Sequence, residues 1–569
     1  MAFADLLEQV GGMGLFQIIN IFLLCVPYLF FSCNNLLQNF VAAIPAHHCQ
    51  LPPMDNINTS WAAGWDPVKQ MEAFIPLDRN HQPEHCLRYT RAHWWLLESN
   101  FTATNTTEMD TEPCKDGWTY DRSKFTSTIV SEWDLVCDQT NMRQMVQFAY
   151  MAGMLVGGSI FGRLSDRFGR RIFLTWCHFH TAVIGVCAAF SPKLVWYCVF
   201  RFLTGVSLSG IGMNSPCLLV EWIPTRKRAV VGTLIGYFFS IGQILLAGLA
   251  YAIRDWRWLQ LTVSLPYFIF FCFSWWIPES ARWLILAKKP EEAVKMLKKV
   301  AKINRKHEEE EKLTTENVNC SMQKELDANE ITHSMFDLVR TSAIRHISFC
   351  TSFAWFSTSF CFYGLILDLQ SFGINIYMIQ VIFGVIDFPA RLITTASLCY
   401  FGRRRTLSAS FFLTSLAILA NIFVPKDMKI LRTSLAVFGK GCIASCFSSI
   451  TLFSSELYPT TIRQTGLSLG HTMARVGAAL SPIMKMTSVY MSSLPFIIYG
   501  AAAFLGALFS YCLPETKDQP LPETIQEVEI RASRSKRKWL CDVNNTNEVQ
   551  ENMDIPMLRL LSKENQSEC

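Results

Sequence analysis

The stretch Gly162-Arg-Leu-Ser-Asp-Arg-Phe-Gly-Arg-Arg171 carries four arginines in ten residues and lies between two long apolar segments. A second arginine-rich stretch, Phe401-Gly-Arg-Arg-Arg405, follows another apolar segment, with its phenylalanine 233 positions after Phe168. Short loops rich in lysine and arginine lie on the cytosolic side of membrane proteins. The two stretches therefore predict a membrane protein whose chain repeats one arrangement of helices.

The composition of the 569-residue chain agrees with a membrane protein. Half of the residues are hydrophobic and 17% are charged, whereas a soluble domain carries about 25% charged residues. The ordinary content of glycine (29) and proline (23) argues against a disordered or collagen-like chain. The net charge of +5 is not gathered in a basic domain, which argues against a nucleic-acid partner.

Twelve apolar segments have the length of about 20 residues that a helix needs to cross a bilayer. These segments are residues 15–41, 142–161, 172–191, 195–217, 229–251, 258–277, 346–367, 374–398, 406–425, 431–455, 464–487 and 493–513. We therefore predict an all-α membrane protein with twelve transmembrane helices in two six-helix halves. Arginine-rich loops follow the second, fourth and eighth segments, and the segment number is even, so both termini are predicted to be cytosolic.

The predicted segments divide the chain into five parts. These are a cytosolic N-terminus (1–14), an N-terminal half (15–284), a cytosolic linker (285–345), a C-terminal half (346–513) and a cytosolic tail (514–569).

The long loop 42–141, within the N-terminal half, is predicted to be extracellular. It holds fourteen acidic against seven basic residues. It carries three N-x-S/T glycosylation acceptors, Asn58, Asn100 and Asn105. It also carries four cysteines, Cys49, Cys86, Cys114 and Cys137. An even number of cysteines in an oxidising compartment predicts two disulfides, and the sequence leaves all three pairings open.

Motifs at the predicted cytosolic helix ends repeat between the halves. Glu221-Trp-Ile-Pro-Thr-Arg-Lys-Arg228 matches Glu456-Leu-Tyr-Pro-Thr-Thr-Ile-Arg463 at an offset of 235 residues. Pro278-Glu-Ser-Ala-Arg282 matches Pro514-Glu-Thr-Lys517 at an offset of 236. Halves repeated in parallel topology predict a pseudo-symmetry axis along the membrane normal and a site between the halves near the midplane.

Charged residues in these motifs predict a cytosolic gate. Arginine and glutamate at helix ends can pair with each other and cap free backbone groups. We expect such contacts to form when the cytosolic side closes and to break when it opens; the alternative is that the arginines only anchor the helices by the positive-inside rule. The predicted gate residues are Arg163, Asp166, Arg167, Arg170, Glu221, Arg228, Glu279, Arg282, Arg403, Glu456, Arg463 and Glu515.

Four charged residues lie inside predicted spans of the C-terminal half: Asp387, Arg391, Lys440 and Arg475. A charge within a span costs about 2.5–3.5 kcal/mol on insertion scales, so such residues usually face a cavity or a partner. Three cations against one anion predict a cavity that attracts anions. For Arg391 the alternative is a local pair with Asp387, four residues earlier, and for Lys440 it is a role at the helix interface.

Aromatic residues crowd the fifth and seventh predicted spans, and one more lies in the tenth. The candidates for a binding wall are Tyr237, Trp355, Phe362, Tyr363 and Phe447. They would give amphipathic anions a large apolar surface with phenol groups as hydrogen-bond donors. The alternative is that each aromatic ring only packs against neighbouring helices or lipid.

Several motifs carry a family resemblance. Gly162–Arg171 resembles the loop signature of the major facilitator superfamily. The loop with its cysteines, Asp110-Thr-Glu-Pro-Cys-Lys-Asp-Gly-Trp118 and Pro278-Glu-Ser-Ala-Arg-Trp283 resemble the organic-ion transporter family. Met1-Ala-Phe and Ile44-Pro-Ala-His-His-Cys49 resemble its organic anion transporter branch. The resemblance implies the major facilitator fold and transport by alternating access.

The resemblance also implies roles for single residues. In anion-carrying relatives a basic residue at the position of Arg475 meets the substrate anion, and the position of Arg391 is commonly lysine. Residues matching Asn35, Tyr237, Trp355, Phe362, Tyr363 and Phe447 line the pocket there, and we add Asp387 as a candidate. The cation-carrying branch has an acid at the position of Arg475, which favours an anion as substrate here.

We therefore predict a secondary-active carrier of amphipathic organic anions at the plasma membrane, with a monomeric transport unit and without cofactor or metal. Carboxylates, sulfate conjugates or urate-like anions are the expected substrates, exchanged for a counter-anion such as a dicarboxylate. The alternatives are an organic cation or zwitterion carrier of the same fold, which would rely on Asp387, and a non-transporting receptor. An enzyme is disfavoured because the sequence has no H-E-x-x-H or G-x-x-x-x-G-K-[ST] motif.

Overall fold

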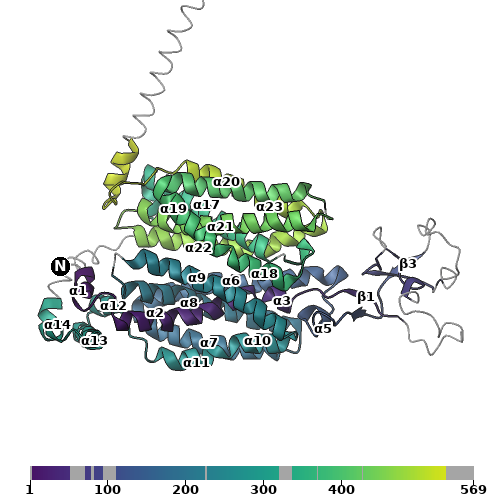
Figure 1. Ribbon diagram of the computed structural model, residues 1–569, viewed down its shortest axis with the longest axis horizontal. Helices are drawn as coiled ribbons and strands as arrows, with labels where there is room; N and C mark the ends of the chain where they lie inside the picture. Colours follow the sequence, from purple (N-terminus) through teal and green to yellow (C-terminus); the bar gives the residue numbers. More distant parts are fainter. Residues whose placement is uncertain are drawn as a thin grey trace, which may run out of the picture.

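Two bundles of long helices lie side by side in the computed structural model (Figure 1). The structure describes residues 3–51, 71–77, 82–91, 93, 110–224, 227–318, 336–367, 369–425 and 427–533. The first bundle consists of α2 (Leu15–Leu36), α3 (Gln38–Val41), α6 (Thr140–Phe168), α7 (Arg170–Ala189), α8 (Leu194–Glu221), α9 (Arg228–Ala252), α10 (Trp256–Ser264) and α11 (Pro266–Ser274). The second bundle consists of α17 (Ser342–Ile366), α18 (Ile376–Val385), α19 (Asp387–Tyr400), α20 (Arg403–Phe423), α21 (Lys429–Leu457), α22 (Arg463–Met486) and α23 (Leu494–Tyr511).

Ten helical segments in the described part of the chain are long and apolar enough to cross a membrane. Two of the twelve predicted spans do not meet that description. The span 258–277 is divided into α10 and α11 at Pro266, which lacks the N–H that a continuous helix needs. The span 464–487 forms α22, whose apolar character is reduced by His471, Arg475 and Lys485. Twelve membrane crossings therefore remain a prediction.

Helix α22 packs against α6, and α18 and α19 pack against α9, so these pairs join the two bundles. Within the first bundle, glycines allow close packing. A Cβ atom on Gly153 or Gly157 of α6 would overlap the backbone of α8. The four-residue spacing of these glycines is therefore explained by packing, as small residues permit close approach of membrane helices.

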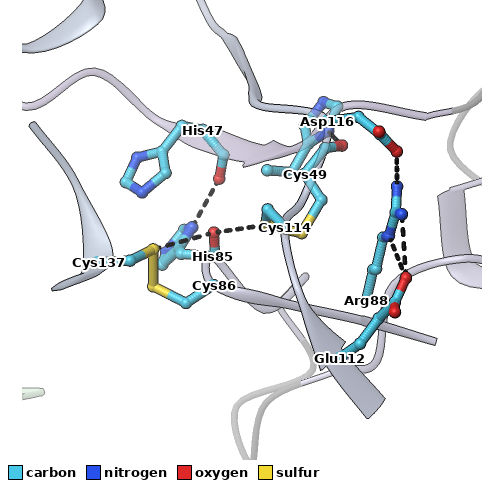
Figure 2. Close-up of a disulfide and its surroundings, with 10 residues drawn as sticks. His47, Cys49, His85, Cys86, Arg88, Glu112, Cys114, Asp116 and Cys137 are labelled. Carbon is cyan, nitrogen blue, oxygen red and sulfur yellow. Dashed lines mark hydrogen bonds and ion pairs between the residues drawn. A yellow bond between two sulfur atoms is a disulfide. The ribbon is translucent and has the colours of Figure 1, made fainter. Parts of the chain in front are cut away.

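Short strands project from one end of the bundles, which we call the cap end (Figure 1). Strand β1 (His47–Cys49) pairs antiparallel with β4 (Trp118–Tyr120), and β2 (Leu87–Tyr89) pairs antiparallel with β3 (Thr111–Pro113). The predicted two disulfides are confirmed, and the pairing is Cys49–Cys114 and Cys86–Cys137 (Figure 2). The predicted acceptors Asn58, Asn100 and Asn105 lie outside the described residues.

Polar contacts fix the cap in place. Arg88 pairs with Glu112 at 2.9 Å and with Asp116 at 2.6 Å, which links β2 to β3 and to the turn after it (Figure 2). Glu132, in α5 (Ile129–Glu132), accepts a hydrogen bond from the Trp256 indole at 2.7 Å and forms an ion pair with Arg257. Since both partners belong to α10, the cap is attached to the first bundle.

The linker lies at the opposite end, which we call the linker end (Figure 1). It contains α12 (Ala281–Leu286), α13 (Pro290–Ile303), α14 (His307–Lys312) and α16 (Asp337–Arg340), and α1 (Phe3–Gln9) lies beside it. Asn304 accepts a hydrogen bond from the Phe16 N–H at 3.0 Å and donates to the Val10 carbonyl at 3.2 Å. The linker thus holds the first turn of α2 and the chain that precedes it.

The disulfide pairing makes a testable prediction. Cys49→Ser should free only Cys114 for a membrane-impermeant maleimide, and Cys86→Ser should free only Cys137, as read by peptide mass spectrometry on intact cells. Each change should also lower surface delivery, because a disulfide of this kind stabilises a fold by about 2–5 kcal/mol. Cys187→Ser, which alters an exposed cysteine of α7 without a disulfide, is the control. Labelling of Cys86 or Cys137 in the Cys49 variant would contradict the pairing.

Candidate functional site

Arg475 extends from α22 of the second bundle into the first bundle. Its Nη1 donates hydrogen bonds to the Met154 carbonyl of α6 at 2.7 Å and to the Ser209 hydroxyl of α8 at 2.6 Å. The side chain is half-buried, and the described residues place no carboxylate at ion-pair distance from it. Its positive charge is therefore held at the bundle interface by neutral acceptors alone.

Arg391 lies at the other contact between the bundles. It projects from α19 toward Gly236 of α9, where a Cβ atom would overlap the guanidinium. Nη1 donates to the Ser448 hydroxyl at 3.4 Å, and Nε has no hydrogen-bond partner among the described residues. Gly158 of α6 makes similar room for Arg475, since a Cβ atom there would lie 3.1 Å from Nε of the arginine. Glycines thus give both arginines space at the interface.

Asp387 does not pair with Arg391, so that alternative for Arg391 is wrong. The Asp387 carboxylate accepts from the Lys440 ammonium at 2.6 Å and from the Ser240 hydroxyl at 2.9 Å. Both charged side chains are almost completely buried, with 0% of Lys440 and 3% of Asp387 exposed. A buried ammonium is costly without an opposite charge, and Asp387 supplies that charge. Both carboxylate oxygens are consequently engaged inside the protein, and their burial keeps them away from a ligand.

This pairing changes the charge balance of the predicted site. The buried pair is neutral overall, so Arg391 and Arg475 remain as the cations of that group without an acidic partner among the described residues. A further buried arginine, Arg201 of α8, stacks over the Tyr150 ring at 4.4 Å and has no exposed surface. Because Arg201 is closed off, Arg391 and Arg475 supply the accessible positive charge beside the buried ion pair among the described residues, while Arg143 lies at the cap end, where it donates to Gln370 at 3.4 Å.

The predicted aromatic residues gather around these charges. Phe362 contacts Phe447 edge to face at a centroid distance of 5.5 Å and Tyr363 at 5.1 Å. The Lys440 ammonium lies 5.0 Å from the centre of the Phe362 ring. Trp355 lies 6.5 Å from Phe447. Trp355 and Phe362 are only 3% and 6% exposed. They therefore pack behind the predicted binding wall and offer little surface to a ligand.

Three of the predicted residues take part in contacts between the bundles. The Tyr363 hydroxyl donates to Asn35 of α2 at 3.3 Å. Tyr237 of α9 stacks on Phe388 of α19 with a centroid distance of 5.1 Å and an interplanar angle of 7°. The predicted wall therefore includes contacts that must change when the bundles move.

Sequence reasoning missed several residues of this interface. Tyr28, Tyr150 and Tyr363, from three helices, lie near the Arg475 guanidinium, and only the last was a candidate. Phe388 and His471, which contact Tyr237 and Trp355, were also missed. These residues lie in predicted spans among many other aromatic residues, so only the position of Phe388 next to Asp387 offered a signal.

Polar and aromatic contacts close the interface at the cap end. The Gln370 side chain accepts from the Ile44 N–H at 3.1 Å and donates to the Ile44 carbonyl at 3.2 Å. Asn39 of α3 donates to the Ile366 carbonyl of α17 at 3.0 Å. Tyr377 of α18 stacks on Phe40 at a centroid distance of 5.5 Å. These contacts join the two bundles between the arginines and the cap.

At the linker end the repeated motifs form matching contacts. Arg170 pairs with Glu221, and Arg403 pairs with Glu456 at 3.0 Å. Glu279 accepts from the N–H groups of Arg170 and Arg171, as Glu515 does from those of Arg403 and Arg404, over 2.9–3.2 Å. The predicted pairing and capping of backbone groups are confirmed.

The other predicted gate residues occupy the same ends. Arg228 and Arg463 donate to the carbonyls of Ile223 and Tyr458 at 3.2 and 3.3 Å. Asp166 lies 3.6 Å from Arg170, and Arg167 stacks on Phe168. Arg282 also interacts with a neighbour, and the Arg163 side chain lies outside the described part.

All of the linker-end contacts with an assigned partner join residues of one bundle, not two. Their opening and closing during a cycle therefore stays a prediction.

The Asp387–Lys440 pair makes a prediction about stability. Asp387→Asn should lower the thermal unfolding midpoint in detergent, since an uncompensated buried charge costs about 3–5 kcal/mol. Adding Lys440→Gln should recover most of the loss, because the buried charge is then absent. Asp138→Asn, which removes an exposed acid of the cap, is the matched control. Equal midpoints for the single variant and the parent chain would contradict a buried pair.

The sequence and the fold were compared with known proteins. Residues 95–528 match the family described as sugar (and other) transporter. The chain is 51% identical over 551 residues to solute carrier family 22 member 6-A of Xenopus laevis, covering 96% of this chain and 97% of that protein. It is 48% identical over 537 residues to organic anion transporter 3 of Oryctolagus cuniculus, covering 94% and 95%.

The fold resembles the E. coli xylose transporter XylE in a partially occluded inward open conformation. The TM-score is 0.59 at 15% sequence identity, and the match covers 89% of this chain and 99% of that chain. This confirms the predicted major facilitator fold. The chain belongs to the organic anion transporter branch of the organic-ion transporters, within the sugar (and other) transporter family of the major facilitator superfamily.

Proposed function

We propose that this protein carries amphipathic organic anions across the plasma membrane by alternating access between its two bundles. The observation that carries the proposal is the pair of interface arginines, Arg391 and Arg475, which have no acidic partner among the described residues. The name of the relative organic anion transporter 3 supports the same substrate class. A single chain supplies both arginines and the aromatic wall, so we propose a monomeric transport unit.

The orientation follows from charge and disulfides. We propose that the linker end, where the repeated arginine motifs lie, is cytosolic, since positive loops stay on that side. The cap end, with two disulfides, then lies outside, where conditions are oxidising. Because Gln370, Asn39 and Tyr377 join the bundles at the cap end, we assign the structure to a state closed toward the outside.

Arg475 links substrate binding to bundle movement. Its guanidinium is bound to Met154 and Ser209 across the interface. A carboxylate or sulfate accepts hydrogen bonds from arginine about twice as strongly as a neutral group does. An arriving anion can therefore replace these acceptors, which releases a contact between the bundles when the site fills.

The aromatic residues suit the apolar part of such substrates. Phe447 and Tyr363 are half-buried and contact Phe362, and Tyr237 and Phe388 form a stacked pair across the interface. Rings of this kind contribute large apolar contact area together with phenol hydrogen bonds. The arginines would bind the charge and the rings the hydrocarbon, which explains a preference for amphipathic anions.

Exchange resolves the energetic difficulty of anion uptake. Moving one negative charge into a cell with a negative interior costs about 2.3 kcal/mol per 100 mV. If the same site carries an anion of similar charge outward, most of that cost disappears. We therefore propose exchange against an internal counter-anion such as a dicarboxylate.

An organic cation carrier is the second candidate, and one observation counts against it. It requires a free acid at the interface, and Asp387 was the candidate in the sequence. Both Asp387 oxygens are occupied by Lys440 and Ser240, and the group is buried. The anion carrier therefore fits the geometry better.

Removing the Arg475 charge tests the proposed function. Arg475→Ala should reduce uptake of a labelled aromatic carboxylate by about 10- to 100-fold, since hydrogen bonds to charged groups contribute about 1.5–3 kcal/mol. Arg475→Lys should retain part of the uptake. Arg345→Ala, which removes an exposed arginine at the start of α17, is the control, and all rates are divided by surface protein. Unchanged uptake in Arg475→Ala, or uptake of an organic ammonium without carboxylate uptake, would overturn the proposal.

Preloading tests exchange separately. Vesicles containing the purified protein should take up the labelled carboxylate several-fold faster when they are loaded with a dicarboxylate than with a neutral osmolyte. The stimulation should persist when the membrane potential is clamped to zero with potassium and valinomycin. Equal rates under both loadings would show uniport and exclude exchange.

A further inference from the structure

A groove runs along the second bundle between α19, α20 and α21, and it is separate from the bundle interface. Its volume is about 530 Å³. Several apolar residues on its rim are strongly exposed, including Ile393 and Phe401 at 65% and Phe438 at 49%. Exposed apolar residues on a membrane-spanning bundle face lipid, so the groove opens to the bilayer and not to water.

The lining is apolar apart from hydroxyl groups and one charge. The lining includes Ile386, Ile393, Phe401, Leu413 and Phe438, with Arg405 as its charged residue. Thr394 donates to the Ala390 carbonyl at 2.6 Å and to the Ser445 hydroxyl at 2.7 Å, while Ser445 donates to the Gly441 carbonyl at 3.2 Å. The Thr394 and Ser445 hydroxyls are thus already hydrogen-bonded within the protein. The charged side chain that the lining offers to a ligand is Arg405.

The three consecutive arginines after Gly402 have different surroundings. Arg403 is paired with Glu456. Arg404 stacks over the Tyr511 ring at 4.2 Å. Arg405 is exposed, lies at the linker-end mouth of the groove, and forms no ion pair with the described residues. The first two side chains thus have partners, and the third is available to a ligand.

The length of the groove is close to the thickness of the hydrocarbon layer of one leaflet. From Arg405 to Leu413, the groove follows eight residues of α20, which is about 12 Å at 1.5 Å per residue. Half of the hydrocarbon core of a bilayer is about 15 Å thick. A molecule with its charge at Arg405 would therefore have an apolar part that reaches nearly to the midplane.

We propose that this groove binds an anionic phospholipid of the leaflet at the linker end. The phosphate of the headgroup contacts Arg405, and one acyl chain lies along α19, α20 and α21. Free inorganic phosphate could use the arginine but not the apolar lining. The lipid would lie next to the buried ion pair of Asp387 and Lys440. Gly441 and Cys442 of the lining directly follow Lys440 in the chain, and Ile386 of the lining directly precedes Asp387. This proposal does not depend on the transported substrate.

Two cysteines allow the lipid to be located. Cys442 lines the groove and is partly buried, whereas Cys399 is exposed on α19 and lies outside the lining. Purified protein in detergent would be titrated with dioleoyl phosphatidylserine, dioleoyl phosphatidylcholine or inorganic phosphate. Alkylation of both cysteines by a small membrane-permeant maleimide is then measured by peptide mass spectrometry, with lipid retention followed by native mass spectrometry.

The expected result is that phosphatidylserine protects Cys442 but not Cys399, at a concentration about fivefold lower than phosphatidylcholine does, as one arginine near anionic lipid contributes about this factor. Arg405→Gln should remove the preference for the anionic lipid and leave weak protection by both lipids. Arg345→Gln, which removes an exposed arginine of α17 at the same end, should behave as the parent chain.

Four results would overturn the proposal. Retention of phosphatidylserine without protection of Cys442 would place the lipid elsewhere. Equal protection by both lipids in the parent chain, or an unchanged preference in Arg405→Gln, would remove the headgroup contact. Protection of Cys442 by inorganic phosphate alone would assign the site to a free anion and not to a lipid.

Discussion

A charged side chain inside a bilayer must be paired or must reach water, and this constraint sorts the ionisable groups of the second bundle. Lys440, which has no exposed surface, is neutralised by Asp387 from the neighbouring helix. Arg391 and Arg475 lie instead where the bundles meet, with glycines facing them and hydroxyl or carbonyl groups as acceptors. The same constraint thus produces a structural ion pair and two interface cations.

The repeated motifs stabilise both bundles through the same kind of local contact. In each half, a glycine with positive φ, 104° at Gly169 and 88° at Gly402, separates two helices. A glutamate from the end of a distant helix then caps the N–H groups that start the second helix. An anionic group at a helix N-terminus is favourable. The Arg–Glu pairs and these caps each join residues of one bundle, so they do not tie the two bundles together.

Hydropathy, charge bias and the repeat were enough to predict the fold class, because membrane helices need long apolar segments wherever they pack. The Arg–Glu pairs and the presence of two disulfides were also predictable. The partner of Asp387 was not, since spacing along one helix identifies Arg391 as a neighbour and cannot show that Lys440, 53 positions away, lies closer. The same limit left the disulfide pairing open and hid Tyr28 and Phe388, whose importance depends on helices that meet only in the folded protein.

The neutral partners of Arg475 bear directly on the proposed cycle. If Arg475 were paired with a buried carboxylate, as Lys440 is, a substrate anion would have to displace a charge-assisted bond and leave a buried acid without a partner, which is costly. Ser209 and Met154 present only a hydroxyl and a carbonyl. An anion can outcompete these groups, and water can replace the arginine afterwards at little cost. In the proposed cycle, a cation held by neutral acceptors from the opposite bundle would keep the interface closed without substrate and release it when an anion binds.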